Sequence, residues 1–332
     1  MIYIFLLGGL FLGWSFGRNN LSSIFGTAIG TRMVSFYKAA FFAALFIFLG
    51  GFFSSAETMF SFLKLAEIKT AAGAFLISIA MALTILLGSK FSVPVSMAQS
   101  SVGAFIGWNL FFHFENDWML IRQIVAAWFY GPIIAALFAI VFFYLLKGVL
   151  KYGHLPLVYR DSWVRLLLMV SGMYSAYFLG ANNMPAIAGM YLKIEGLPPS
   201  FVLGCVCFSI VLGVFTADKR VIQTVSHGLF PLSPLEALVV VFSCGLTLYC
   251  FSSVGLQNLL QSIHCPSFPL VPISSSGVLV GAIMGVGFVK GHAGFHWGGI
   301  CKMVASWLVI PVASGLICWS ILAILSKGGF AL

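Results

Sequence analysis

One stretch of sequence occurs twice in this chain. The pattern VPxSxxxxxVGAxxG covers Val93–Gly107 and returns at Val271–Gly285 with a constant offset of 178 residues. So many shared letters exclude a chance match between apolar segments. Each copy sets a proline and several hydroxyls before a glycine-rich apolar run, which predicts a helix that begins inside a membrane with free backbone NH groups. A kinked spanning helix is the alternative for either copy alone, but the duplication favours a binding site.

The composition excludes a soluble domain. Of the 332 residues, 61% are hydrophobic and 8% are charged, whereas soluble chains carry roughly a quarter charged residues. We therefore expect a multi-pass protein integral to the plasma (inner) membrane. The apolar start Met1–Leu7 contains no cation, so it does not predict a cleaved signal peptide.

The net charge of +9 lies mostly in short connections. It is densest at Lys147, Lys151, Arg160 and Arg165, which predicts a cytoplasmic central connection by the positive-inside rule. No soluble segment is long enough to gather these cations into a nucleic-acid site, so we expect no nucleic-acid partner. The expected partners are a small anion and the lipid bilayer, and a homodimer is an assembly that we leave open.

Further features recur in the two halves. The tetrapeptide GRNN at 17–20 has its counterpart GANN at 180–183, at an offset of 163, and VAAW at 125–128 recurs as VASW at 304–307. The chain is therefore predicted to be an internal duplication, with residues 1–150 and 151–332 as two repeats of one membrane domain. We predict an all-α polytopic membrane protein of two inverted repeats, with broken helices and re-entrant helical hairpins.

Hydropathy predicts membrane spans at Ile2–Phe16, Ser35–Phe53, Thr70–Leu87, Arg122–Leu146 and Val164–Leu179. The polar stretch after Phe16 predicts a break in the first helix, because a charge and two amides are costly inside a membrane unless they face a cavity or a partner.

The polar residues of the repeated motifs are the candidate substrate ligands. Amides donate and accept hydrogen bonds, hydroxyls do the same, and helix N-termini add NH groups and partial positive charge. Such a lining suits a small oxyanion. The candidates are Asn19, Asn20, Asn182, Asn183, Ser96, Gln99, Ser100, Ser274, Ser275, Ser276 and Arg18. Arg18 is either a counter-charge for the anion or a side chain that snorkels or pairs with a loop acid.

No acidic residue lies in these motifs, although a driving sodium ion or proton is commonly held by a carboxylate inside the membrane. An uncoupled facilitator or channel is therefore a competing function, and a membrane subunit without transport activity is another. The sequence contains no HExxH motif and no paired membrane aspartates. We expect no catalytic residues, no metal site and no cofactor.

The motifs resemble those of the inorganic phosphate transporter family. GRNN and GANN are similar to its GAND motif, and Pro94–Ser96 and Pro272–Ser274 to its PVSTTH element; the segment 224–234 resembles the stretch before the second PVSTTH. The resemblance covers nearly the whole chain. It implies ion-coupled uptake of phosphate by two inverted repeats, with these elements forming the anion and cation sites.

This chain departs from the family pattern where the coupling ion is concerned. The GAND aspartates are Asn20 and Asn183, and Gln99 stands where the first PVSTTH has its histidine. Sodium or proton coupling is therefore left open. Paired asparagines and a glutamine also resemble the sulfate-permease branch of the family. Phosphate keeps a proton and gains from an acceptor, whereas sulfate prefers donors alone. We expect phosphate narrowly before sulfate.

Overall fold

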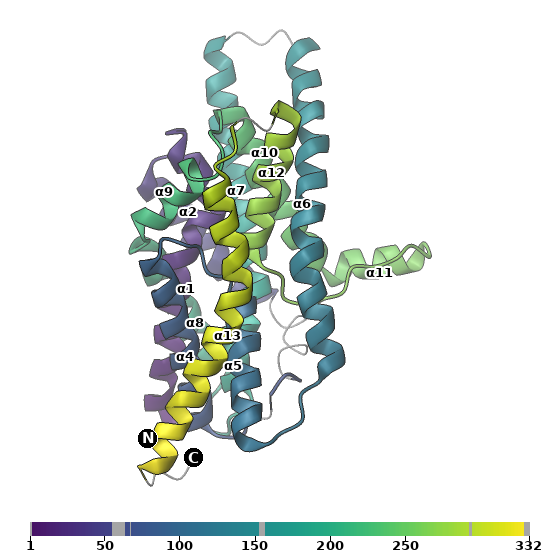
Figure 1. Cartoon of the computed structure of the whole chain (residues 1–332). Helices are drawn as coiled ribbons and strands as arrows, with labels where there is room; N and C mark the ends of the chain where they lie inside the picture. Colours follow the sequence, from purple (N-terminus) through teal and green to yellow (C-terminus); the bar gives the residue numbers. More distant parts are fainter. Residues whose placement is uncertain (1, 55–63, 67, 153–156, 292–293, 329–332) are drawn as a thin grey trace.

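The structure is a computed structural model that describes residues 2–54, 64–66, 68–152, 157–291 and 294–328. Every regular element in these residues is a helix (Figure 1), which confirms the all-α class. In chain order they are α1 (Ile2–Gly30), α2 (Phe36–Phe53), α4 (Ala71–Lys90), α5 (Met97–Phe112), α6 (Trp118–Tyr152), α7 (Leu157–Leu192), α8 (Pro199–Phe215), α9 (Lys219–His227), α10 (Pro234–Ser252), α11 (Val254–Ser262), α12 (Ser275–Lys290) and α13 (Trp297–Lys327).

Six of these helices are long and apolar enough to cross a bilayer, namely α2, α4, α6, α7, α10 and α13. A seventh span is formed if α8 and α9 are counted together, since they meet at a bend of 71°. Bulky apolar side chains such as Leu308, Val312 and Leu316 on α13 are exposed along the bundle, as expected of helices that face lipid. The chain is therefore a multi-pass integral membrane protein.

The predicted break in the first helix is wrong. Helix α1 continues through the GRNN motif, and α7 continues through GANN and Pro185. The second asparagine of each motif donates a hydrogen bond to a backbone carbonyl of its own helix. The amide nitrogen of Asn20 donates to the carbonyl of Phe16 at 3.1 Å, and that of Asn183 donates to the carbonyl of Leu179 at 2.9 Å. The polar side chains therefore do not need to interrupt the helical backbone.

Helix packing follows one scheme twice. Helix α1 packs on α8 and α4 as α7 packs on α2 and α10, and α5 lies against α13 as α12 lies against α6. Two glycines show that the equivalent helix pairs touch at equivalent positions. A Cβ on Gly17 would lie 2.1 Å from the carbonyl oxygen of Ile210, and a Cβ on Gly180 would lie 2.3 Å from the carbonyl oxygen of Ile47. All four positions obey the 163-residue offset. The two helix pairs therefore approach backbone to backbone at equivalent places.

Helices α1 and α7 run in opposite directions. Helix α1 begins at the end of the bundle where both termini lie, which we call the terminal end, and α7 begins at the opposite end (Figure 1). The same holds for α5, which runs towards the terminal end, and α12, which runs away from it. Equivalent helices in the two halves are thus inverted along the long axis of the bundle.

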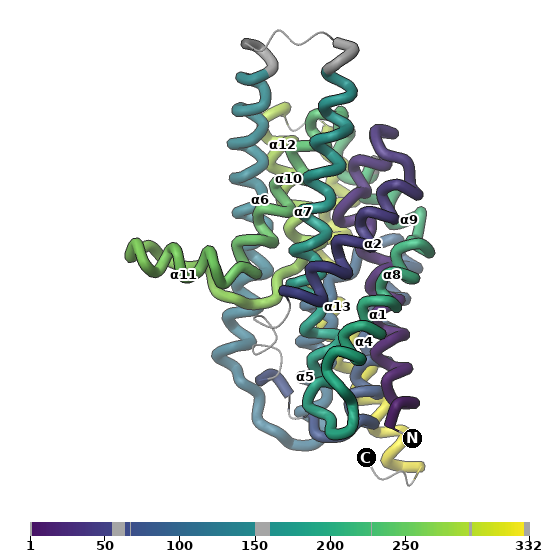
Figure 2. The backbone as a smooth tube through the Cα atoms, turned by 180° about the vertical axis from the view of Figure 1, so that it is seen from behind, coloured from purple at the N-terminus to yellow at the C-terminus, as the bar shows by residue number. Residues whose placement is uncertain are grey.

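The second half contains an insertion between α10 and α12 that the first half does not have between α4 and α5. Ser89 and Pro94 are 5 positions apart, whereas their counterparts Ser252 and Pro272 are 20 apart. The additional residues form α11 and the segment after it, and α11 projects sideways from the bundle in both views (Figures 1 and 2). This insertion explains why the offset between the halves changes from 163 to 178.

Candidate functional site

Two short helices begin in the interior of the bundle, as the repeated motif predicts. Helix α5 starts after Ser96, whose hydroxyl accepts from the amide of Gln99 at 3.4 Å, and α12 starts after Ser274, whose hydroxyl accepts from the amide of Gly277 at 3.1 Å. Both caps are buried. The NH groups of the first turn have no backbone acceptor within the helix. The N-terminus of each short helix, which we call its tip, therefore presents donors and the positive end of a helix dipole to the protein interior.

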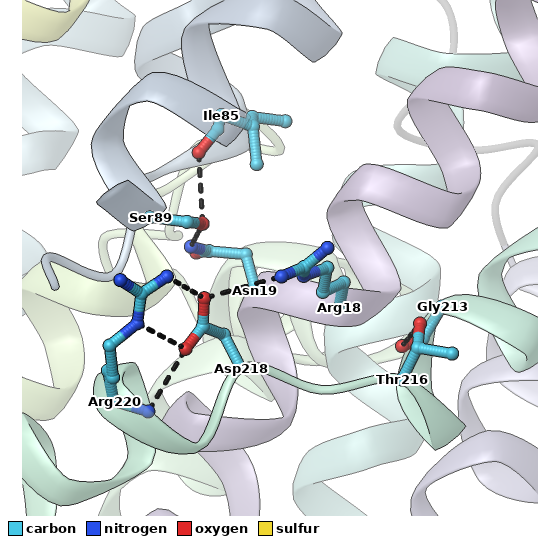
Figure 3. A network of polar contacts seen from close by, with 8 residues as sticks. All are labelled: Arg18, Asn19, Ile85, Ser89, Gly213, Thr216, Asp218 and Arg220. Carbon is cyan, nitrogen blue, oxygen red and sulfur yellow. Dashed lines mark hydrogen bonds and ion pairs between the residues drawn. The ribbon is translucent and has the colours of Figure 1, made fainter. Parts of the chain in front are cut away.

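Asn19 and Asn182 hold these two tips in the same way. The side-chain oxygen of Asn19 accepts from the backbone amide of Val95 at 2.8 Å, and that of Asn182 accepts from Ile273 at 3.3 Å. Each amide nitrogen donates to a serine hydroxyl, at Ser89 for Asn19 (Figure 3) and at the equivalent serine of α10 for Asn182. Each of these two asparagines therefore uses one donor and one acceptor to fix the segment that precedes a short helix, and each amide nitrogen has a second N–H.

A hydrogen bond joins α1 of the first half to α12 of the second half at the candidate site. The hydroxyl of Ser275, in the first turn of α12, donates to the side-chain oxygen of Asn20 on α1 at 3.2 Å. The equivalent of Ser275 in the first half is Met97, which has no hydroxyl. Helix α1 also packs on α7, and α5 packs on α7, so the four motif-bearing helices form one interior region.

Gln99 is the unusual residue of the region. Its side chain is completely buried, and neither its amide oxygen nor its amide nitrogen has a hydrogen-bond partner among the described residues. Leaving a buried amide unpaired costs about 1–3 kcal/mol, so such groups point to a missing ligand or water. Gln99 lies in the first turn of α5, where the backbone NH groups also lack helical acceptors.

Arg18 lies apart from this region. Its guanidinium is 3.5 Å from the carboxylate of Asp218, which also binds Arg220 at 3.1 Å (Figure 3). The guanidinium also lies over the ring of Trp14, 5.4 Å from the centroid. Asp218 is in the bend between α8 and α9, so the structure places Arg18 on a loop acid, the second of the two roles considered from the sequence.

The remaining serines divide into two groups. The hydroxyl of Ser100 lies 3.1 Å from that of Ser314 on α13, so Ser100 joins two helices. Ser101 donates to the carbonyl of Ala98 in its own helix. Ser276 stays at the tip of α12, 3.2 Å from the hydroxyl of Ser274. The structure therefore gathers Ser96, Gln99, Ser274, Ser275 and Ser276 with the four asparagines, and turns Ser100 and Arg18 to other partners.

Sequence reasoning missed two residues that complete the tips, Ser89 and Ser252. Ser89 lies near the end of α4 and Ser252 at the end of α10, and both accept from the first asparagine of a motif. They obey the 163-residue offset, as Asn19 and Asn182 do. A search for polar residues paired at that offset would have found them.

The candidate site is enclosed and carries no formal charge. Its asparagines, Gln99 and the three tip serines are at most 4% exposed. A cavity of about 860 Å³ at the terminal end reaches α5 at Phe105 and α7 at Pro185. The candidate site itself, which is distinct from the lining of this cavity, offers amide and hydroxyl groups and two helix N-termini, so it can supply hydrogen-bond donors to a small anion.

Comparisons with known proteins agree with this architecture. The model of the phosphate transporter family matches residues 16–318. A Methanocaldococcus jannaschii protein named "Putative phosphate permease" is 24% identical over 312 residues, covering 94% of each chain. The sulfate permease CysP of Bacillus subtilis is 22% identical over 334 residues, covering 98% of this chain and 88% of its own.

A solved structure has the same fold. The structure titled "The sodium-dependent phosphate transporter" aligns with a TM-score of 0.79 at 22% sequence identity, covering 98% of this chain and 99% of its own. The family model, the full-length relatives and this fold lead to one conclusion. The chain belongs to the phosphate transporter family.

Proposed function

We propose that the protein carries a small tetrahedral oxyanion, phosphate first, across the plasma membrane, and that it binds the anion between the N-termini of α5 and α12. The single observation that carries this proposal is the buried amide of Gln99, which lacks a partner among the described residues at the start of one of these helices. A bound anion would satisfy that amide, and the two helix N-termini would balance its charge.

The same amide favours phosphate over sulfate. Phosphate near neutral pH keeps a proton on one oxygen and needs an acceptor for it. The side-chain oxygen of Gln99 is buried and has no partner among the described residues, so it can accept a hydrogen bond from the phosphate hydroxyl while the amide nitrogen donates to a second phosphate oxygen. Sulfate is the second candidate, because no acidic side chain lies in the motifs and one relative is named a sulfate permease.

We infer two inverted repeats, residues 1–150 and 151–332, that exchange access to the site by alternating access. The equivalent contacts of Gly17 and Gly180 and the opposite directions of α1 and α7 support this division. The cavity at the terminal end reaches Phe105 and Pro185, whereas the cavity of about 760 Å³ at the opposite end has neither of their equivalents, Ile283 and Ser22, in its lining. This conformation is therefore nearer to opening at the terminal end.

The coupling ion is a separate part of the proposal. Sodium or proton coupling would need ligands other than the family aspartates, since Asn20 and Asn183 are neutral. Backbone carbonyls and side-chain oxygens can ligate sodium without a carboxylate. An uncoupled facilitator is the alternative function that the absent carboxylates favour.

The test is uptake of radiolabelled phosphate and sulfate by proteoliposomes, with sodium and proton gradients imposed separately. We expect saturable phosphate uptake that sulfate inhibits weakly. Uptake that neither gradient stimulates would establish a facilitator, and faster uptake of sulfate would reverse the order of substrates. Absence of uptake for both anions would overturn the proposed function.

A further inference from the structure

The cavity at the end opposite the termini is lined by three cations. It has a volume of about 760 Å³ and lies between the end of α1, the start of α2 and the first half of α7. Arg32, Lys38 and Arg165 contribute to its wall, and no acidic residue in the described part of the chain does. All three are exposed, and none of them has an ion-pair partner in the part of the chain that the structure describes.

The start of α2 adds hydrogen-bond donors to the same wall. Ser35, the N-cap, and Phe36 both line the cavity, and the hydroxyl of Ser35 makes no capping bond. The NH groups of the first turn of α2 therefore remain available, and the helix dipole places partial positive charge there. Three unpaired cations and an uncapped helix of 18 residues converge on one hollow.

The rest of the wall is apolar. Phe42, Met169 and Met173 line it below the cations, along the groove where α2 packs on α7. The segments of α2 and α7 that are long and apolar enough to cross a bilayer begin at Phe36 and at Arg160. The three cations therefore lie near the start of these two membrane spans. That is the level of lipid headgroups, and the apolar wall continues into the level of acyl chains.

The fold does not require these cations. The internal offset of 163 residues relates Arg32 to Glu195, Lys38 to Phe201 and Arg165 to Ile2. Glu195 and Ile2 line the cavity at the terminal end, so the positions equivalent to Arg32 and Arg165 carry an acid and an apolar side chain there. The lysines of that cavity, Lys64, Lys69 and Lys193, come from other positions and share its wall with a second acid, Asp117. Acids therefore offset the lysines in the wall of the terminal-end cavity, whereas no acid among the described residues lines the cavity at the other end, the end that the positive-inside rule places in the cytoplasm.

We propose that this cavity binds one anionic phospholipid, with the phosphodiester held by Arg32, Lys38, Arg165 and the N-terminus of α2, and with an acyl chain along the α2–α7 groove. Basic pockets between membrane helices on the cytoplasmic side have the charge and shape that anionic headgroups need. The site is independent of the transport proposal, because lipid retention requires no substrate.

The experiment measures lipid retention by native mass spectrometry of the full chain, purified in detergent and titrated with phosphatidylglycerol or phosphatidylcholine. We expect preferential retention of phosphatidylglycerol. The variant Arg32→Gln/Lys38→Gln/Arg165→Gln should bind it on the order of 100-fold more weakly, since each basic side chain near an anionic lipid contributes roughly fivefold. The charge-matched control Lys64→Gln/Lys193→Gln/Lys327→Gln should bind as the wild type does.

Two further arms separate the sources of the anion. Millimolar inorganic phosphate should not displace phosphatidylglycerol; displacement would make the cavity a vestibule for the transported anion and overturn the lipid assignment. Equal losses in the two triple variants would also overturn it, because diffuse surface charge would then explain retention. If the first triple variant does not fold, two other variants test the assignment. Arg165→Gln alone must weaken phosphatidylglycerol retention, and the charge-conserving variant Arg32→Lys/Arg165→Lys must keep it near the wild-type level; any other result overturns the assignment.

Discussion

Asn19 accepts a hydrogen bond from the backbone amide of Val95 at 2.8 Å, across 76 positions of sequence. Asn182 makes the same bond to Ile273 at 3.3 Å. Each short helix is thus tied to a long helix of its own half just before its N-terminus. Any movement of α1 relative to α7 must therefore move the two tips relative to each other.

Replacing Asn19 with alanine should lower both stability and uptake. The change leaves the buried backbone amide of Val95 without its partner, which costs about 1–3 kcal/mol, whereas the hydroxyl of Ser89 keeps its bond to the carbonyl of Ile85. Thermal unfolding in detergent and phosphate uptake in proteoliposomes measure the two effects. Asn258→Ala, on the exposed face of α11, is the control and should change neither. Wild-type stability of Asn19→Ala would show that the bond does not hold the tip.

Gln99→Met should separate binding from stability. Methionine has a similar volume and buries no unpaired amide, so the thermal stability should stay the same or rise. Phosphate affinity should fall about tenfold through loss of roughly 1.4 kcal/mol of hydrogen bonding. Gln257→Met on α11 is the matched control. Full retention of phosphate affinity in Gln99→Met would remove this residue from the site.

Ser274→Ala should weaken uptake through the second tip. The substitution removes the hydroxyl that caps α12, a loss of about 1 kcal/mol in typical helices, and leaves the buried amide of Gly277 unpaired. Ser96→Ala should act in the same direction at α5, where the capping bond is longer. Uptake kinetics for both variants check this; an effect of Ser274→Ala no larger than that of Ser262→Ala on α11 would contradict it.

Gly281→Ala should impair folding because the helices meet at that point. A Cβ on Gly281 would lie 2.1 Å from the carbonyl oxygen of Pro132, so α12 and α6 would have to separate. The equivalent substitution Gly103→Ala meets the carbonyl of Pro311 at 2.0 Å. Gly148→Ala is the control, since nothing lies within 4 Å of its Cβ. The yield of monodisperse protein measures the effect, and normal yields of both tight variants would refute this packing.

Arg18→Gln should leave phosphate affinity within about twofold of the wild type. Asp218 keeps its bond to Arg220, and a partly exposed ion pair contributes about 1 kcal/mol or less. The measurement is the concentration dependence of uptake, with Arg220→Gln as the parallel variant. Abolished uptake by a stable Arg18→Gln protein would mean that Arg18 is the counter-charge of the anion after all.

The tips could be predicted from sequence because their signals are local. A proline, several hydroxyls and a glycine-rich run within a few residues predict that a helix begins at each motif, and α5 and α12 do begin there, three residues after Pro94 and Pro272. Duplication strengthened each signal, since an accidental motif does not recur at a fixed offset. The two different offsets, 163 and 178, also contained the insertion that forms α11.

The continuity of α1 could not be predicted because it depends on where two amides find partners. Asn20 bonds to its own helix, whereas Asn19 bonds to Ser89 and Val95 from a distant part of the chain. The partner of Arg18 is likewise 200 positions away at Asp218. Residue type gives the capacity for a hydrogen bond, and only the packed helices decide which group uses it.

The central claim is that the anion binds between the N-termini of α5 and α12 beside Gln99. Its most direct test is an anomalous difference map from crystals of the full protein soaked with arsenate, a tetrahedral analogue of phosphate. The account predicts one peak at the two tips, within hydrogen-bond distance of the Gln99 amide. A peak beside Arg18 instead, with none at the tips, would contradict it.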